Sequence, residues 1–359
     1  MASAQPEPTL ADNSTLPRKP PLTREERRLR REQRRAKQRE ANVGRARKMH
    51  QQRLAAPAPK TKPAAKRAST TATRHYVGCS GWYYWHLRDS FYKGLPQKDW
   101  FAHYAKNFST VEINASFYSW PTEANVKSWL RAIGRKQFTY TVKACELITH
   151  VKRFRNTKTL VQDFGYIADL LGPRMGCFLF QMPPSFRYTA SRLRMILAQL
   201  DPRHRNVVEF RHASWWNEDV YAAFREAGAI FCSCSGPRLP DTLVKTADDI
   251  YIRFHGVKRW YRHDYSVEEL QEWVDRIRKS RAKRVWIYFN NDHDAYAVKN
   301  ARAIARLLKQ AAGATRTGKT KDGPAKPGHG KTATEKPGRE KPSRGKTVPA
   351  TSRPDRRRA

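Results

Sequence analysis

Eight short segments between residues 75 and 309 alternate apolar and polar residues in the way that a half-buried β-strand does. In the segment 110–118, Val111 and Ile113 fall on one face, and Glu112 and Asn114 fall on the other. Comparable segments begin at Tyr76, Thr110, Thr139, Gly176, Asn206, Ala229, Ile250 and Val285. The alternation predicts eight strands, most of which end in polar or aromatic residues.

Stretches with helical periodicity separate nearly all of these strands. They cover residues 99–107, 122–133, 157–171, 190–200, 215–227, 267–279 and 295–308, and only the link between the sixth and seventh strands lacks a clear helix. Thr122, Ser214, Ser266 and Asp294 can cap helix N-termini, and Gly134, Gly172 and Gly228 stand where helices should end. Strands and helices that alternate in this number predict a single (β/α)8 TIM-type barrel. A doubly wound open sheet is the alternative, but its glycine-rich phosphate loop is missing.

The composition changes on both sides of this region. Residues 1–74 hold 20 Lys or Arg against 6 Asp or Glu, and residues 310–359 hold 14 against 4, so the tails carry +14 and +10 of the net charge of +39. Both tails are poor in apolar residues, which predicts disorder. The expected organisation is a disordered basic tail over residues 1–74, a barrel domain over 75–309 and a second disordered basic tail over 310–359.

An arginine-rich helix is predicted inside the first tail. Thr23 and Glu26 form a capping box, and the residues that follow favour helix. No apolar stripe runs along this helix, so we expect it not to dock on a core. Two interpretations stay open: the helix binds RNA or another polyanion, or it is a solvated segment that contributes only charge.

The chain shows no apolar run of membrane-spanning length and no secretory signal near Met1, so we expect a cytoplasmic protein. Its five cysteines all lie in strand-like segments, and their odd number argues against a disulfide framework. Cys232 and Cys234 share a strand face and could hold a metal, but buried strand residues are the favoured interpretation.

Seven motifs occur in order between Tyr76 and Leu308. They are GCSGWYYW, TVEINASFY, FTYTVKACELITH, FLFQMPPSF, VVEFRHASWW, IYIRFHG and VWIYFNND, followed by the pair Asn300 and Ala301. In these motifs the chain resembles the YecE-like family, known as domain of unknown function 72. The resemblance implies a TIM barrel and an intracellular protein. It implies no reaction and no catalytic residues, because no activity is established for the family.

The strand parity places a set of polar side chains inside the barrel. Val208 and Phe210 match the face that packs on helices, so Glu209 and Arg211 point inward. The same argument gives the inward set Glu112, Asn114, Lys143, Gln181, Glu209, Arg211, Arg253, His255 and Asn290. Because active sites of such barrels lie at the C-terminal ends of the strands, this set predicts a polar site at that mouth.

The formal charges of this set are unequal. Glu112 and Glu209 oppose Lys143, Arg211 and Arg253, and His255 can add a further positive charge. An unpaired buried charge is costly, so a small phosphate- or carboxylate-bearing ligand should complete the set. We expect Arg211 and Arg253 to bind this anion in a bidentate manner, with Asn114 and Asn290 as orienting donors. The alternative is an internal salt-bridge network that needs no ligand.

If the mouth is catalytic, metal-independent acid–base chemistry is the expected mechanism. Glu112 or Glu209 would be the general base, and His255 or Lys143 the acid. The loop residue His150 can close over the opening. Gln181 and the aromatic residues Trp82 and Tyr118 complete the predicted ligand-binding set.

Three other functions stay open. Glu112, Glu209, His255 and Asp292 could bind a metal in a metal-dependent isomerase or hydrolase, but the nearby cations disfavour a divalent ion, so no metal and no cofactor is expected. Glycoside hydrolysis needs two carboxylates flanking the bond, and Glu112 and Glu209 come from strands across the barrel, which predicts too long a separation. A non-enzymatic protein that binds RNA or DNA through its basic tails is the third.

Overall fold

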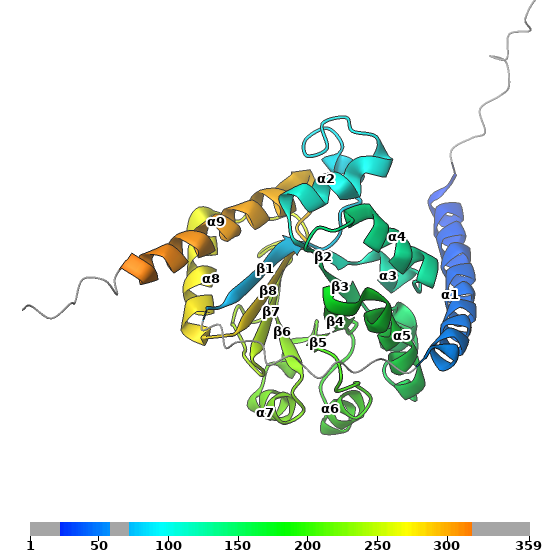
Figure 1. The fold of residues 1–359 in the computed structure, drawn as a ribbon. Helices are drawn as coiled ribbons and strands as arrows, with labels where there is room; N and C mark the ends of the chain where they lie inside the picture. Colours follow the sequence, from blue (N-terminus) through cyan, green and yellow to red (C-terminus); the bar gives the residue numbers. More distant parts are fainter. Residues whose placement is uncertain (1–21, 58–71, 318–359) are drawn as a thin grey trace, which may run out of the picture. The chain divides into compact units, whose positions relative to one another are not determined.

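The computed structural model describes residues 22–57 and 72–317, with eight parallel strands at its centre (Figure 1). The strands are β1 (Arg74–Cys79), β2 (Thr110–Ile113), β3 (Thr139–Lys143), β4 (Met175–Gln181), β5 (Asn206–Glu209), β6 (Ile230–Ser235), β7 (Asp249–Phe254) and β8 (Arg284–Phe289). They lie in the order β1-β8-β7-β6-β5-β4-β3-β2, and each pairing is parallel. The predicted (β/α)8 barrel is therefore confirmed.

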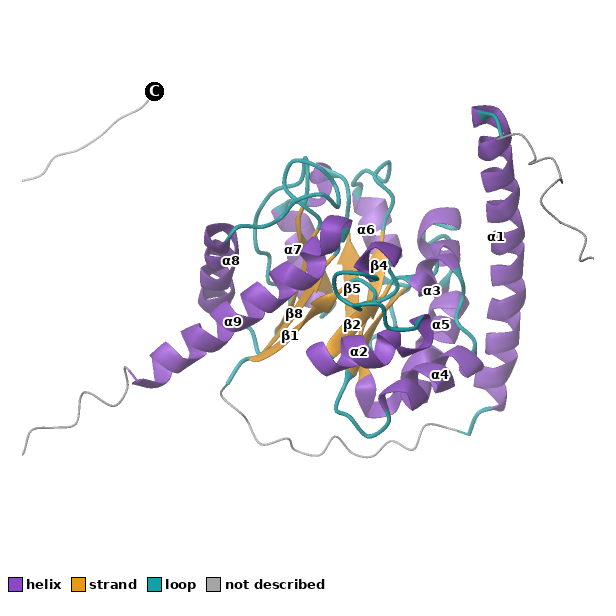
Figure 2. Cartoon of the chain, turned by 90° about the horizontal axis from the view of Figure 1, so that it is seen from above, coloured by secondary structure: helices purple, strands orange, loops and turns teal. Residues whose placement is uncertain are grey.

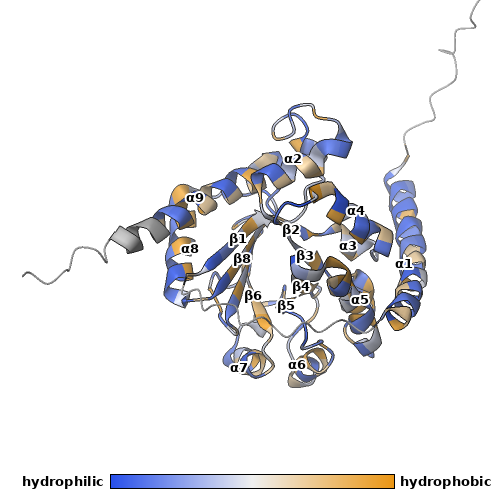
Figure 3. Cartoon of the chain, viewed as in Figure 1, coloured by the Kyte–Doolittle hydropathy of each residue, from blue (hydrophilic) through white to orange (hydrophobic). Residues whose placement is uncertain are grey.

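Helices surround these strands (Figure 2). They are α1 (Arg24–Ala55), α2 (Trp100–Asn107), α3 (Ala115–Tyr118), α4 (Glu123–Ile133), α5 (Lys158–Leu171), α6 (Ala190–Leu197), α7 (Glu218–Glu226), α8 (Val267–Ser280) and α9 (Tyr296–Thr317). Short 3-10 turns and one π-helical turn, η4 (Leu147–Val151), lie between them. Figure 3 shows apolar residues on the strands and on the surrounding helices, whereas α1 is mostly hydrophilic.

The predicted helix ends are partly correct. Thr122 and Ser266 cap α4 and α8, and Gly134, Gly172 and Gly228 adopt positive φ where helices stop. The caps predicted for α7 and α9 are wrong. Asn217 caps α7 in place of Ser214, accepting from the N–H of Val220 at 3.1 Å. Asp294 lies in a left-handed turn before α9.

Tyr104 closes the barrel where the strand order leaves β1 and β2 unpaired among the described residues. Its hydroxyl accepts a hydrogen bond from the N–H of Cys79 at 2.8 Å and donates one to the carbonyl of Thr110 at 3.0 Å. Gly78 permits the two strands to approach, because a Cβ atom there would lie 2.4 Å from the Thr110 oxygen. A side chain from α2 thus supplies the connection that a ladder would otherwise make.

The segment 110–118 is only half strand. β2 ends at Ile113, Asn114 has helical dihedral angles, and α3 follows directly. The single hydroxyl proton of Ser116 is shared between the carbonyl oxygens of Ile113, at 2.7 Å, and Lys143, at 2.6 Å. The expected alternation therefore holds through Glu112, and the turn after Ile113 brings α3 against the end of β3.

α1 docks through its C-terminal half, so the expectation that it cannot dock is wrong. Asn42, Ala46 and Met49 are buried on one face of the helix. The Asn42 side chain accepts from the N–H of Trp120 at 2.9 Å and donates to the carbonyl of Tyr118 at 3.0 Å. A short patch at helical spacing, anchored by two hydrogen bonds to backbone groups, takes the place of the missing apolar stripe.

Ion pairs reinforce this docking. Arg53 contacts the carboxylate of Asp163 on α5 at 2.8 Å, and Arg39 contacts Glu146, just after β3, at 3.4 Å. The predicted capping box of Thr23 and Glu26 is present at the other end of α1. The helix is thus held beside the C-terminal ends of β2 and β3.

The chain divides into two compact units, Met1–Ala312 and Gly313–Ala359, and the barrel lies in the first. The tail predicted to begin at residue 310 starts too early, because α9 is helical to Thr317. The other predicted tail segments, 1–21, 58–71 and 318–359, lie outside the described residues. No helix in the described part of the chain has both the length and the apolar character that a membrane span needs.

Candidate functional site

The inward-facing residues of the strands stack in layers along the barrel. Nearest the N-terminal end, Asp249 on β7 pairs with Arg284 on β8 at 2.7 Å. Above it, the hydroxyl of Tyr288 lies 2.7 Å from that of Thr110 and 2.9 Å from that of Thr141. The charged layer follows where the strands end. The strand parity inferred from the sequence therefore places these side chains correctly.

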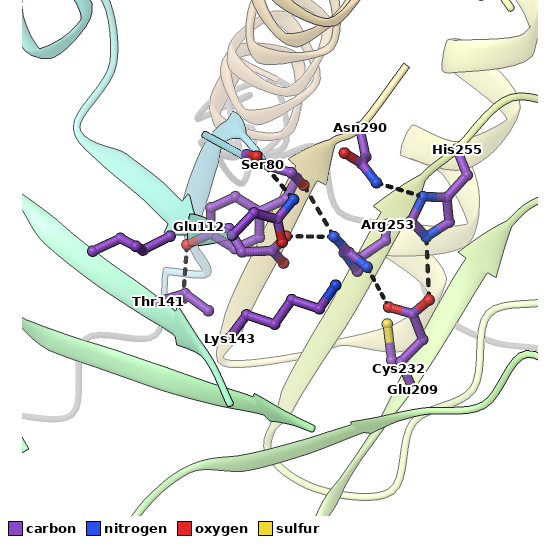
Figure 4. Close-up of polar contacts among 12 residues, drawn as sticks. Ser80, Glu112, Thr141, Lys143, Glu209, Cys232, Arg253, His255 and Asn290 are labelled. Atoms are coloured by element: carbon purple, nitrogen blue, oxygen red, sulfur yellow. Dashed lines mark hydrogen bonds and ion pairs between the residues drawn. The ribbon is translucent and has the colours of Figure 1, made fainter. Parts of the chain in front are cut away.

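Arg253 joins two carboxylates inside the barrel (Figure 4). Its Nη1 donates to Glu209 at 2.5 Å and its Nη2 donates to Glu112 at 2.5 Å. Its Nη2 also lies 3.3 Å from the hydroxyl of Ser80. All three charged side chains are fully buried. One guanidinium from β7 thus links β2 and β5 through the interior.

The role expected for Arg253 as a ligand partner is therefore wrong. Both of its terminal nitrogens donate to carboxylates, and its buried Nε has no hydrogen-bond partner in the structure. A group with this geometry acts as an internal crosslink. The salt-bridge alternative is correct for Arg253, and an anion would have to bind elsewhere in the mouth.

Arg211 extends this network toward the opening. Its Nε donates to Glu209, its Nη2 lies 3.1 Å from Nε2 of His255, and its guanidinium lies 4.4 Å from the ring centre of Trp260. No described group accepts a hydrogen bond from its Nη1. The charges of two guanidinium groups and two carboxylates thus balance. Arg211 keeps one nitrogen, Nη1, that can donate to a ligand.

His255 does not add a positive charge. Burial, together with the Arg211 and Arg253 guanidinium groups, holds the pKa of His255 well below its usual value. Its Nδ1 lies 3.2 Å from the amide nitrogen of Asn290. A neutral imidazole has one acceptor nitrogen, and Arg211, which can only donate, requires it to be Nε2. The expectation of a further cation, or of an imidazolium acid, is therefore wrong.

Lys143 holds the surplus charge of the set. Burial lowers the pKa of its amine from 10.5 to about 7, and the positive charges of Arg253 and Arg211 oppose the carboxylates of Glu209 and Glu112. Its amine lies 4.3 Å from the ring centre of Phe117 and forms no ion pair with any described carboxylate. Figure 4 shows it extending toward Arg253 and Glu209. The predicted excess of positive charge exists only while this amine is protonated.

The two carboxylates are poorly placed to act as general bases. Although burial would raise the pKa of Glu209, Arg211 and Arg253 hold it well below its usual value. Glu112 accepts a hydrogen bond from Tyr251 as well as from Arg253. A general base must reach the proton that it removes, and both side chains are fully buried. The geometry favours Lys143 as the group that exchanges protons with a ligand.

His150 lies on the π-helical turn η4, beside the opening. Its ring lies 4.8 Å from that of Phe117, and its Nδ1 lies 2.9 Å from the hydroxyl of Thr149. Burial and the charge of Lys143 lower the pKa of His150 to about 4. It is therefore a neutral neighbour of the Lys143 amine, and π-helical turns often occur at functional sites.

The remaining predicted ligand-binding residues differ in their availability. Asn114 donates to the carbonyl of Ser80 at 2.9 Å, while its buried Oδ1 has no partner in the structure. Gln181 donates to the carbonyl of Met182 at 3.1 Å. Tyr118 is exposed, whereas Trp82 packs on Phe101 with ring centres 4.4 Å apart. Asn114 thus offers an acceptor to a ligand, and Trp82 stabilises the core beside the mouth.

Sequence reasoning missed three residues that shape the mouth. Tyr251 lies two residues before Arg253 on β7. Residues two apart in a strand share a face, so the alternation that placed Arg253 inside the barrel also places Tyr251 there. Ser80 directly follows β1 and contacts Arg253. Phe117 lies on α3 beside Lys143, and no strand pattern could have indicated it, because the chain turns before reaching it.

The metal site considered from the sequence is not assembled. Within the described residues, the metal-ligating atoms that come within 4.8 Å of one another belong to Glu209, Cys232 and Cys234. The two sulfur atoms lie 3.8 Å apart, and burial raises the pKa of the Cys232 thiol well above its usual value. A metal would need thiolates there, beside the guanidinium of Arg253, so this set does not fit a divalent ion.

The distance argument against a glycosidase is wrong, but its conclusion is supported on other grounds. Glu112 and Glu209 come from opposite sides of the barrel, yet they bind the two terminal nitrogens of one guanidinium. A scissile bond would have to occupy the position of Arg253. The two carboxylates therefore have a structural role as the partners of Arg253.

A separate groove of about 820 Å³ lies where β1 begins and α2 ends, against α9. Its cationic lining residues include Lys299, Arg302, Arg306 and Lys309, and no carboxylate lines it. Its lining residues His75 and Ser109 lie at the N-terminal ends of β1 and β2, opposite the C-terminal strand ends where TIM-barrel sites lie.

Comparison with known proteins identifies related chains. The family model described as "Protein of unknown function DUF72" matches residues 76–325. The chain is 27% identical over 271 residues to the UPF0759 protein YunF of Bacillus subtilis (strain 168), covering 65% of this chain and 94% of that protein. α1 precedes the matched residues, so its docking lies outside the family match.

Solved structures share the barrel. A DUF72 family protein from Thermotoga maritima MSB8 is 26% identical with a TM-score of 0.60, and the match covers 66% of this chain and 99% of that one. A DUF72 family protein from Enterococcus faecalis V583 is 19% identical with a TM-score of 0.55, covering 67% and 99%. The second likeness concerns the fold alone.

Proposed function

Since this chain belongs to the DUF72 family, whose description assigns no function, we propose from its own geometry that the barrel mouth binds a small phosphate- or carboxylate-bearing ligand. One observation carries the proposal: Arg211 keeps an open donor in the same charged layer as Lys143, whose amine has no described anionic partner and whose pKa the Arg211 charge helps to lower. A ligand anion would supply that partner. We infer a cytoplasmic location as well, where the five buried thiols would stay reduced.

The ligand should carry a hydrogen-bond donor in addition to its anionic group. Asn114 presents an Oδ1 that is buried and without a partner. Leaving such an acceptor unpaired costs about 1–3 kcal/mol, which a hydroxyl or amino group of the ligand would recover. A small hydroxy acid or a phosphorylated alcohol fits both requirements. The acid–base chemistry available to such a ligand rests on Lys143, because the carboxylates are sealed beneath Arg253.

Titration calorimetry with glycolate and with inorganic phosphate tests this proposal. We expect millimolar or tighter binding at pH 7, and Arg211→Lys should weaken it at least tenfold, because a single ammonium cannot contact Glu209 and His255 and still present a donor to the ligand. Arg306→Lys, in the separate groove, should leave the affinity unchanged. Binding should also take up protons near pH 7 to 8, since a bound anion raises the pKa of Lys143.

Two outcomes would overturn the assignment. The first is no heat of binding at millimolar glycolate or phosphate. The second is an equal loss of affinity in the Arg211 and Arg306 variants, which would mean that the anion does not bind specifically at the mouth.

A second candidate function rests on α1. Its docked half spans residues 38–53, and residues 24–37 stay exposed. The exposed half holds seven Arg and one Lys against three Glu. Arg39 contacts Glu146 after β3, so the exposed half begins beside the barrel mouth. We infer that this half of α1 binds the phosphate backbone of RNA or DNA, which would make it an arm of fixed orientation.

The salt dependence of single-stranded RNA binding tests the arm, measured by fluorescence anisotropy on the full chain. Replacing Arg27, Arg30, Arg31 and Arg34 together with glutamine should make the slope of log K against log salt less negative by roughly 3, at about 0.7 per lost phosphate contact. A matched variant with glutamine at four exposed basic positions on other helices, Arg131, Arg194, Arg225 and Arg278, should keep the original slope. Equal slopes for both variants would contradict the proposal.

A further inference from the structure

We propose that Lys143 is a nucleophile that forms an imine with a carbonyl compound bearing an anionic group, such as an aldehyde acid or an α-keto acid. The proposal rests on the proposed anion site for the identity of the charged group only. The imine itself depends on the surroundings of the amine.

The position of the amine is unusual for a structural lysine. Two carboxylates lie in the same barrel interior, yet both of them bind Arg253, and no described carboxylate pairs with Lys143. Its neighbours are the ring of Phe117 at 4.3 Å and the positive charges of Arg253 and Arg211. A buried lysine that only held the fold together would be expected to pair with a carboxylate. This one lies against a hydrocarbon surface and two cations, an environment that activates lysine amines.

The protonation state of Lys143 suits nucleophilic attack. Burial, with Arg253 and Arg211, lowers the pKa of the amine to about 7, so about half of the molecules carry a free amine at neutral pH. An ordinary exposed lysine, with a pKa of about 10.4, carries a free amine in only about one molecule in several thousand. Only the free amine has the lone pair that attacks a carbonyl carbon.

The Lys143 side chain is not completely sealed, because 8% of the residue's surface stays exposed. Its amine forms no ion pair with a described carboxylate. Ser116 donates to the backbone carbonyl of Lys143 and fixes the start of this side chain at the end of β3.

The chemistry balances without any co-reactant. The nitrogen lone pair attacks the carbonyl carbon, a carbon–nitrogen bond forms, and the carbonyl π electrons move to oxygen. The two protons of the amine end on that oxygen, the carbon–oxygen bond breaks, and water leaves as the carbon–nitrogen double bond forms. No atom is oxidised or reduced. Protonation of the imine by solvent gives an iminium ion, which draws electrons from the adjacent carbon atom.

The neighbouring side chains fit such a substrate. A carboxylate next to the carbonyl would accept from the open Nη1 of Arg211, which Trp260 holds in place from one side. A hydroxyl on the substrate would donate to Oδ1 of Asn114. The negative charge of the carboxylate would also offset the iminium charge, which two guanidinium groups otherwise disfavour.

Borohydride trapping of the full chain with glyoxylate at pH 7 tests the proposal. Reduction of the imine leaves a carboxymethyl group on the reacting lysine, and peptide mass mapping locates it. Lys143 should be labelled at least tenfold faster than the exposed Lys158 in the same molecule. The rate at Lys143 should rise with pH to a plateau whose midpoint lies near 7. Lys143→Arg should remove the fast site and leave the rate at Lys158 unchanged.

Acetaldehyde, a carbonyl compound without charge, separates this proposal from the anion site. Fast labelling of Lys143 by both compounds at equal rates would support the imine and count against the anion site. Faster labelling by glyoxylate than by acetaldehyde would support both. Labelling of Lys143 no faster than of Lys158 with either compound would overturn the imine proposal, and calorimetry with glycolate would still decide the anion site.

Discussion

Arg253→Met is expected to lower the free energy of unfolding by about 3–5 kcal/mol, the cost typical of breaking a buried ion pair by removing one partner. The substitution leaves Glu112 in a fully buried site with only the Tyr251 hydroxyl as a partner. Glu209 keeps Arg211 but loses its second guanidinium. Equilibrium unfolding in urea, followed by tryptophan fluorescence, measures the change.

A double variant distinguishes the charge from the packing of the side chain. In Arg253→Met with Glu112→Gln, the uncompensated carboxylate is gone, so the double variant should be more stable than Arg253→Met alone. Arg225→Met serves as the control, because its pair with Glu218 is exposed on α7 and should contribute at most about 1 kcal/mol. If Arg253→Met cost no more than Arg225→Met, or if Glu112→Gln destabilised it further, the crosslink would not hold the mouth together.

The natural protein is expected to become more stable between pH 7 and pH 9, and Lys143→Met is expected to abolish this rise. Burial holds the pKa of this amine at about 7, against 10.5 for an ordinary lysine. Above pH 7 the unfolded chain therefore binds the proton that the folded protein has lost, and the free energy of unfolding increases with pH. Over these two pH units the increase due to Lys143 is about 2 kcal/mol.

The sign of this effect is diagnostic. Below pH 7 the amine is charged in both states, so the folded protein bears the full cost of burying the charge, and the methionine variant should be the more stable one. That advantage should shrink as the pH rises toward 9. Urea midpoints at half-unit intervals for the natural chain, Lys143→Met and Lys158→Met would show it. Lys158 is exposed, so its variant should follow the natural curve in parallel. If the curve for Lys143→Met ran parallel to that of the natural chain, the pKa of the Lys143 amine would not be lowered in the folded protein.

The barrel could be predicted because its signals are local and repeated. Alternation along each strand indicated which side chains face inward, and Glu112, Lys143, Glu209 and Arg253 all lie there. Glycines with positive φ end three helices where the sequence placed them. Such features depend on the backbone within a few residues, so an isolated sequence contains them.

The hydrophilic character of α1 was read correctly, but its packing was not. A helix needs an apolar stripe along its whole length only if the whole helix packs against the protein core. Here Asn42, Ala46 and Met49 suffice, since the Asn42 amide satisfies two backbone groups near Trp120. A search for a short patch at the spacing i, i+4, i+7 would have indicated it. The surface to which it docks, at the end of α3 and just beyond, could not have been inferred.

The alternation of residues along the chain was enough to establish the eight strands, their inward faces and a mouth with more cations than anions. It could not assign partners, because Arg253 reaches both Glu112 and Glu209 only when the closing barrel brings three strands together. When the barrel closes, Arg253 pairs with two interior carboxylates, and Arg211 keeps one donor nitrogen without a described acceptor. Lys143 forms no ion pair with any described carboxylate. Charge is a property of each residue, but its compensation depends on distances across the barrel, and these distances decide the chemistry of the mouth.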